Sequence, residues 1–110
     1  MSDGGRPMKA ARKYKEKTLV MRTLTAEAEG LLAEAKPGDA KEVCRRVYEV
    51  LRYSDPMTGD AVAETEEKLM EAMKTFTKSV KENNTAEVTK TAEEMIRIAE
   101  ERNRLNRLNK

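Results

Sequence analysis

Residues 24–51, LTAEAEGLLAEAKPGDAKEVCRRVYEVL, decide the fold, because residues 69–96, LMEAMKTFTKSVKENNTAEVTKTAEEMI, repeat their pattern at a spacing of 45. In both stretches apolar residues recur three or four positions apart on either side of a short polar turn, which is typical of a helical hairpin. The shift pairs apolar residues throughout: Leu24 with Leu69, Ala28 with Met73, Leu31 with Phe76, Ala35 with Val80, Val43 with Val88, Val47 with Ala92, Val50 with Met95 and Leu51 with Ile96.

The residues around these stripes predict four helices, near residues 7–35, 39–54, 59–82 and 85–108. Pro7 suits a first helical position, and Pro56 disfavours helical geometry at the residue before it. Short connections force consecutive helices to run antiparallel. We therefore predict an all-α, antiparallel up-down-up-down four-helix bundle built from two repeated helical hairpins.

The repeat also aligns two helix starts. Asp39 and Glu42 form a capping-box pattern at the start of the second helix, and the shift places Asn84 and Glu87 at the start of the fourth. We expect Asp39 and Asn84 to be equivalent caps, each contributing about 1 kcal/mol.

Length and composition favour one domain. The chain has 110 residues, of which 38% are hydrophobic and 38% charged, a balance that suits helices burying one stripe each. We expect a disordered tail over residues 1–6 and a single bundle over residues 7–110. No apolar run approaches the length of a membrane span, and the lone Cys44 agrees with a reducing compartment, so we expect a cytoplasmic protein with no membrane partner.

The residue types exclude much catalytic chemistry. The chain has no histidine and one cysteine, whereas metal sites in bundles and most Ser or Cys nucleophiles depend on imidazole. Glu64, Glu67 and Glu71 share a helical face, but neighbouring lysines indicate a solvated, ion-paired surface rather than a metal site. We therefore expect no catalytic residue, no metal and no cofactor, and we predict that the protein is not an enzyme.

Charge is distributed unevenly along the chain, although the net charge is only +2. Residues 1–22 carry +5 and residues 102–110 carry +4, so the middle of the chain is acidic. The up-down order predicts that both basic ends meet at one pole. The candidate binding residues for an anionic partner are Lys9, Arg12, Lys13, Lys15, Lys17, Arg102, Arg104 and Arg107.

Two functions fit this pattern. Cations near a helix N-terminus oppose the helix dipole, which is easier to understand if something anionic binds them. We favour a small non-catalytic interaction or adaptor protein that engages a protein partner. The alternative is DNA or RNA binding through the basic pole, which the scarcity of aromatic residues that could stack on bases makes less favoured.

One acidic residue falls on the apolar stripe. Glu66 is the repeat partner of Met21, and an unpaired carboxylate is costly to bury. Glu66 either joins Tyr53 and Arg102, which lie at the same height, in a polar cluster, or turns into solvent. The sequence also allows a homodimer in which two chains exchange hairpins, because the same stripes are then buried.

Overall fold

The computed structural model describes the backbone of residues 5–109 and the side chains of residues 15–109. It contains α1 (Gly5–Glu34), α2 (Asp39–Arg52), the 3-10 turn η2 (Asp60–Val62), α3 (Ala63–Lys81) and α4 (Thr85–Leu108), with no strand among the described residues. The all-α prediction is confirmed. The predicted ends lie within two residues of the observed ones, except that η2 takes the expected start of α3.

The first helix begins two residues earlier than predicted, inside the segment expected to be a disordered tail. Gly5 and Arg6 already belong to α1, and the remainder of that prediction, residues 1–4, lies outside the described residues. The helix therefore runs for 30 residues, much longer than the mean of about 11–12 in globular proteins.

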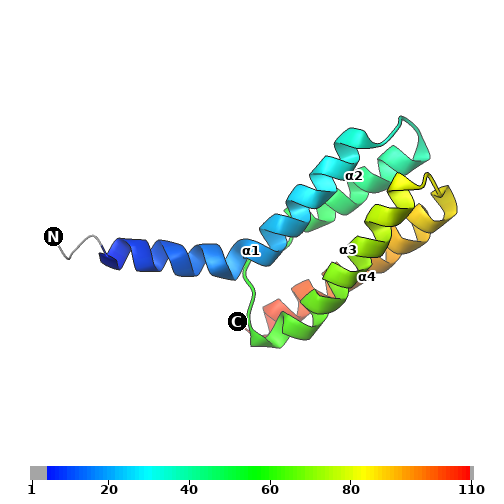
Figure 1. Ribbon diagram of the computed structural model, residues 1–110. Coiled ribbons are helices and arrows are strands. Elements are labelled where there is room, and N and C mark those ends of the chain that lie inside the picture. The colour runs from blue at the N-terminus through cyan, green and yellow to red at the C-terminus, as the bar shows by residue number, and fades with distance from the viewer. Residues whose placement is uncertain (1–4, 110) are drawn as a thin grey trace.

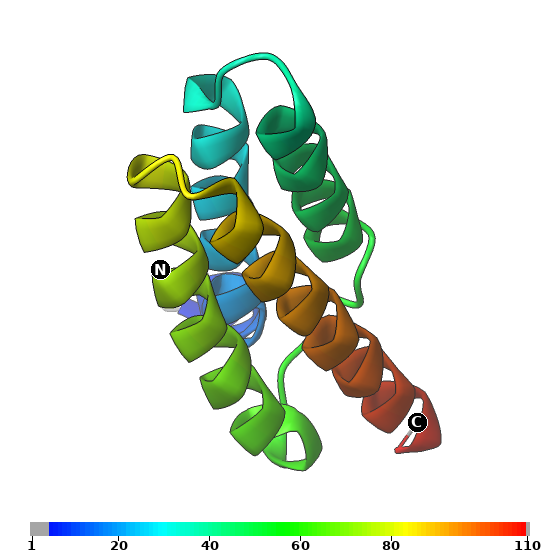
Figure 2. The same ribbon diagram turned by 90° about the vertical axis from the view of Figure 1, so that its right-hand side faces the viewer.

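The two hairpins pack side by side (Figures 1 and 2). Helix α1 packs mainly on α2, α3 packs mainly on α4, and the hairpins meet chiefly through α2 and α4. Consecutive helices alternate in direction, as predicted, whereas the neighbours α2 and α4 run parallel (Figure 2). Since α2 and α3 lie diagonally opposite, residues 53–62 must cross the end of the bundle, and we call this segment the crossover.

One continuous core fills the bundle. Of the residues expected to face inward, Leu24, Leu31, Val47, Leu51, Leu69, Met73, Phe76 and Met95 are buried, and Ile96 is partly buried against them. Phe76 is fully buried, so its removal should cost about 3–5 kcal/mol.

The turn between α3 and α4 closes with a Schellman motif. Asn83 adopts a left-handed conformation with φ 56°, and its N–H donates to Val80 O at 3.1 Å. The Asn84 N–H donates to Ser79 O at 3.0 Å, which completes the pattern. Asn84 also caps α4, because its side chain accepts from the Glu87 N–H at 3.2 Å. The predicted cap at Asn84 is confirmed.

The turn between α1 and α2 is built differently, and the predicted cap at Asp39 is wrong. The N-cap is Gly38, whose φ of 133° favours glycine, and Asp39 is the first residue of α2. No side chain caps this helix start. Instead Lys41 Nζ donates to two carbonyls at the end of α1, Leu32 O at 3.2 Å and Ala35 O at 3.4 Å. This cation is favourable at a helix C-terminus.

Candidate interaction surface

A buried ion pair fixes the crossover to α3 and α4. Arg102 of α4 is fully buried, and its Nε donates to Glu66 Oε2 of α3 at 2.7 Å. Its two terminal nitrogens donate to crossover carbonyls, to Asp55 O at 2.6 Å and to Met57 O at 2.8 Å. The guanidinium therefore binds both a carboxylate and the backbone that crosses the bundle.

Neighbouring polar groups complete this cluster. Thr58 Oγ1 donates to Glu66 Oε1, Asn106 Nδ2 donates to Met57 O at 3.1 Å, and Asn103 Nδ2 donates to Ser54 Oγ at 3.0 Å. Among the described side chains, no buried nitrogen or oxygen lacks a partner. We call Glu66, Arg102, Asn103 and Asn106, with the crossover residues they bind, the crossover cluster. Because its polar groups are satisfied internally, it stabilises the fold rather than offering a site for a ligand.

The predicted polar cluster is therefore right for two residues and wrong for the third. Glu66 and Arg102 meet, whereas Tyr53 is 74% exposed and takes no part. Its ring lies 5.5 Å from the Arg52 guanidinium at the molecular surface. The residues missed were Thr58, Asn103 and Asn106; the spacing of the two asparagines, three apart on one helical face, was the available signal.

The residues of the predicted basic pole differ in their exposure and in their partners. Assigning Arg102 to an anion-binding surface is wrong, because that side chain is buried and internally paired. Arg104 is exposed but holds Glu101 through two hydrogen bonds, and this pairing lowers the pKa of Glu101 and raises that of Arg104. Arg107, Lys15 and Lys17 are exposed. The side chains of Lys9, Arg12 and Lys13 lie outside the described residues.

The N-terminal half of α1 projects beyond the bundle (Figure 1). Thr18 is buried, whereas the three residues before it are exposed. We call residues 5–17 the arm. The helix changes direction where the arm joins the bundle (Figure 1), close to the point where the Thr58 N–H donates to Lys17 O at 2.7 Å. An outside donor to a helix carbonyl is a recognised cause of such a bend.

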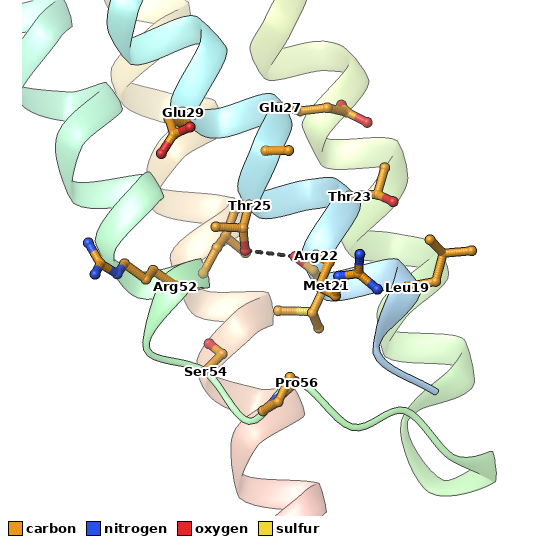
Figure 3. Close-up of a pocket in the computed structure, with 12 residues that line it drawn as sticks. Leu19, Met21, Arg22, Thr23, Thr25, Glu27, Glu29, Arg52, Ser54 and Pro56 are labelled. Atoms are coloured by element: carbon orange, nitrogen blue, oxygen red, sulfur yellow. Dashed lines mark hydrogen bonds between the residues drawn. The ribbon is translucent and has the colours of Figure 1, made fainter. Parts of the chain in front are cut away.

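A groove of about 870 Å³ lies at the root of the arm, between α1, α2 and the crossover (Figure 3). Pro56 is exposed at this groove, the buried Met21 and Leu51 lie beneath it, and the rim carries two arginines and two glutamates: Arg22, Arg52, Glu27 and Glu29. The rim is partly tied together, because Tyr48 Oη donates to Glu29 Oε2 at 3.2 Å and accepts from Arg52 at 3.4 Å. Its charges balance.

A second groove, of about 310 Å³, lies between α1 and α3. Leu19, 56% exposed, and Met70, 37% exposed, line it together with Val20 and Leu24. Leu19 also borders the first groove, so this side chain forms an apolar ridge between them. Leu19 and Met70 thus expose apolar side chains near the root of the arm.

A third groove, of about 520 Å³, follows the seam between α3 and α4 and is acidic. Its walls carry the carboxylates of Glu64, Glu67, Glu71 and Glu94 against one cation, Lys68. The expected ion-paired surface is partly present, because Lys68 lies 4.0 Å from Glu64 and Lys74 lies 3.3 Å from Glu71. Within residues 15–109, Glu67 and Glu94 form no ion pair.

The cysteine is not exposed to solvent. Cys44 is buried on α2, and this burial raises the pKa of its thiol above the usual value, although Lys41 acts weakly in the opposite direction. Such a thiol is a poor nucleophile at neutral pH. In the part of the chain that the structure describes, no three His, Cys, Asp or Glu residues gather as a metal-binding set. None of the described helices is long and apolar enough to cross a membrane.

Comparisons with known proteins add no relative: no family model matches this sequence, and no curated protein or solved structure matches it.

Proposed function

We propose that this protein is a small non-catalytic interaction protein whose arm engages a protein partner. The observation that carries the proposal is the projection of α1 from the bundle, because a helical segment outside a packed core is marginally stable in water. The arm holds six Lys or Arg residues and one Glu, a net charge of +5. It has no acidic residue in its first turn to stabilise it through the helix dipole.

The root of the arm supports the same function. Leu19 and Met70 expose apolar area there, and the adjoining groove adds the exposed Pro56, whereas Met21 and Leu51 beneath it belong to the buried core. A partner that binds the arm would therefore also contact Leu19, Met70 and Pro56. An apolar centre with a polar, solvent-accessible rim is the usual composition of a protein interface. We place the protein in the cytoplasm, where an unpaired cysteine stays reduced.

Site-specific photocrosslinking tests this function. A photoreactive residue replaces Glu16 on the arm or, as a matched control, Glu82 at the opposite end of the bundle; both positions are exposed. In nuclease-treated native extract, we expect the arm position to give one abundant protein adduct, identified by mass spectrometry, and the control position not to give it. Equal labelling at both positions would contradict the proposal. So would adducts that form in untreated extract but not in nuclease-treated extract.

Nucleic-acid binding is the second candidate, and the exposed Lys15 and Lys17 at the base of the basic arm favour it. Binding would then weaken steeply with salt, because each phosphate contact releases counterions. Replacing Lys9, Arg12, Lys13, Lys15 and Lys17 by Gln should flatten that salt dependence, as fluorescence anisotropy with labelled DNA and RNA would show. Absence of binding at low salt removes this candidate.

A further inference from the structure

The arm and the acidic groove have opposite charge, and they belong to parts of the molecule that do not meet. The arm projects from the bundle at the N-terminal end of α1 (Figure 1), whereas residues of α3 and α4, in the other hairpin, line the groove. Because α1 is one helix through residue 34, the arm cannot fold back onto its own groove without breaking. Any contact between the two must therefore join separate molecules.

Helical spacing concentrates the positive charge of the arm. Arg6, Lys9, Lys13 and Lys17 recur at intervals of three and four, so they occupy one face of the helix. Ala10 and Tyr14, four apart, occupy the neighbouring face. The arm is therefore a basic helix with a small apolar strip beside its cationic row.

The acidic groove offers the complementary surface. Its lining carries a net charge of −3, or −2 when Lys74, which pairs with Glu71, is included, and Ala72 and Ile98 supply apolar floor between the carboxylates. Glu67 and Glu94, which form no ion pair within the described residues, stand on opposite walls, one on each helix. A cationic row laid along the seam could pair with both walls.

The dimensions also agree. Thirteen helical residues make the arm about 20 Å long, and the groove, measured along α3 from Glu64 to Thr75, runs for about 17 Å. The other two grooves lack this match, since the positive and negative charges that line each of them balance. Charge thus selects the α3/α4 seam as the arm's docking surface.

We infer that the arm of one molecule docks in the α3/α4 acidic groove of a second copy of the same chain, so that the protein associates with itself. This inference rests on the proposed function and names the partner. Each copy supplies one arm and one groove, so two reciprocal contacts can close a dimer. The attraction between exposed charges should weaken as salt rises.

A charge swap tests the inference. The groove variant carries Glu67→Lys, Glu71→Lys and Glu94→Lys, and the arm variant carries Arg6→Glu, Lys9→Glu, Lys13→Glu and Lys17→Glu. A control variant carries Glu82→Lys, Glu93→Lys and Glu100→Lys, the same charge change at exposed positions outside the groove lining. Circular dichroism verifies folding of each, and sedimentation equilibrium at low and moderate salt measures association.

We expect the wild-type chain and the control to associate, and the groove and arm variants to weaken association at least about tenfold, the effect of removing a few favourable charge pairs. An equimolar mixture of the two variants should restore association, because each reversed arm then meets a groove of opposite charge. This restoration does not follow from a merely structural effect of either set of substitutions.

Other outcomes overturn the inference. A monomeric wild-type chain at high concentration does so, as does a groove variant that associates like the control. If the wild-type chain is monomeric but the arm still crosslinks to a different protein, the proposed function stands and the self-association fails. If the arm instead binds only labelled nucleic acid, and the arm variant alone loses that binding, both the inference and the favoured function fail.

Discussion

The chain extends beyond its repeat at both ends, and the two extensions have different environments. Shifted by 45, the first residue of α3, Ala63, aligns with Thr18, and the last residue of α2, Arg52, aligns with Arg97. The arm therefore has no counterpart in the second hairpin, and residues 98–108 of α4 have none in the first. Both extensions are helical and both carry a net positive charge, but the first projects from the bundle whereas the second packs against the crossover.

The difference comes from what each extension can bind. The crossover passes beside the end of α4, and Arg102 and Asn106 satisfy its carbonyls. The arm accepts a hydrogen bond from the crossover through the Lys17 carbonyl, and its helix projects from the bundle (Figure 1). A basic residue near a chain end is thus structural where backbone carbonyls need donors, and available for binding where none are near.

The largest expected effect comes from Arg102→Met. The substitution leaves Glu66 buried without its partner and removes donors from two crossover carbonyls, so unfolding free energy should fall by about 3–5 kcal/mol. Urea denaturation measures the loss. Arg107→Met, an exposed change on the same extension, is the matched control and should cost at most about 1 kcal/mol, the loss of a favourable cation in the last turn of α4.

A double variant separates lost charge pairing from lost packing. Adding Glu66→Gln to Arg102→Met removes the unpaired buried charge, so part of the stability should return. If Arg102→Met unfolds no more easily than Arg107→Met, the crossover cluster does not anchor the α4 extension and the contrast with the arm is lost.

A smaller effect is expected from Asn106→Ala. This change removes a single hydrogen bond, to Met57 O, and should cost about 0.5–1.5 kcal/mol. Asn109→Ala, which removes a local bond to the Leu105 carbonyl near the helix end, serves as the comparison. Equal effects at both positions in urea melts would indicate that helix end effects, rather than the crossover, stabilise the α4 extension.

The repeat itself also permits a comparison, at the opposite end of the bundle. Asn84→Ala removes an observed cap and should cost about 1 kcal/mol, whereas Asp39→Ala removes no capping bond and should cost less. Thermal and urea melts of both variants decide this. Equal losses would restore the equivalence that the sequence suggested.

The sequence predicted helices and core well because both depend on local spacing. The stripes around Leu31 and Phe76 give a helix period, and Pro37, Gly38 and Asn83 mark the turns. It did not predict that α2 and α3 lie diagonally opposite, because an apolar stripe does not say which neighbour covers it. The ten-residue crossover was long enough for either arrangement.

The candidate site was harder to predict for the same reason. Arg102 and Arg107 look alike in sequence, and their different burial follows from the path of the crossover. Asp39 and Asn84 are likewise repeat partners. However, the N-cap of α2 is Gly38, one position earlier in the repeat than the N-cap of α4, Asn84, so Asp39 lies inside the helix and does not cap it. Pairwise contacts of this kind depend on tertiary structure rather than on pattern.

The smallest expected effect is on the arm, and it tests the contrast directly. Replacing Lys9, Arg12, Lys13, Lys15 and Lys17 together by Gln should leave the thermal midpoint unchanged or slightly higher, because removing a cation from the start of a helix relieves about 0.3–1 kcal/mol of unfavourable dipole interaction. Circular dichroism melts measure the midpoint at a protein concentration low enough to keep the chain monomeric. Hydrogen exchange follows the arm amides separately. A midpoint lowered by several degrees would mean that these side chains stabilise the bundle. The arm would then be a second packed extension like the end of α4, and its availability to a partner would have to be abandoned.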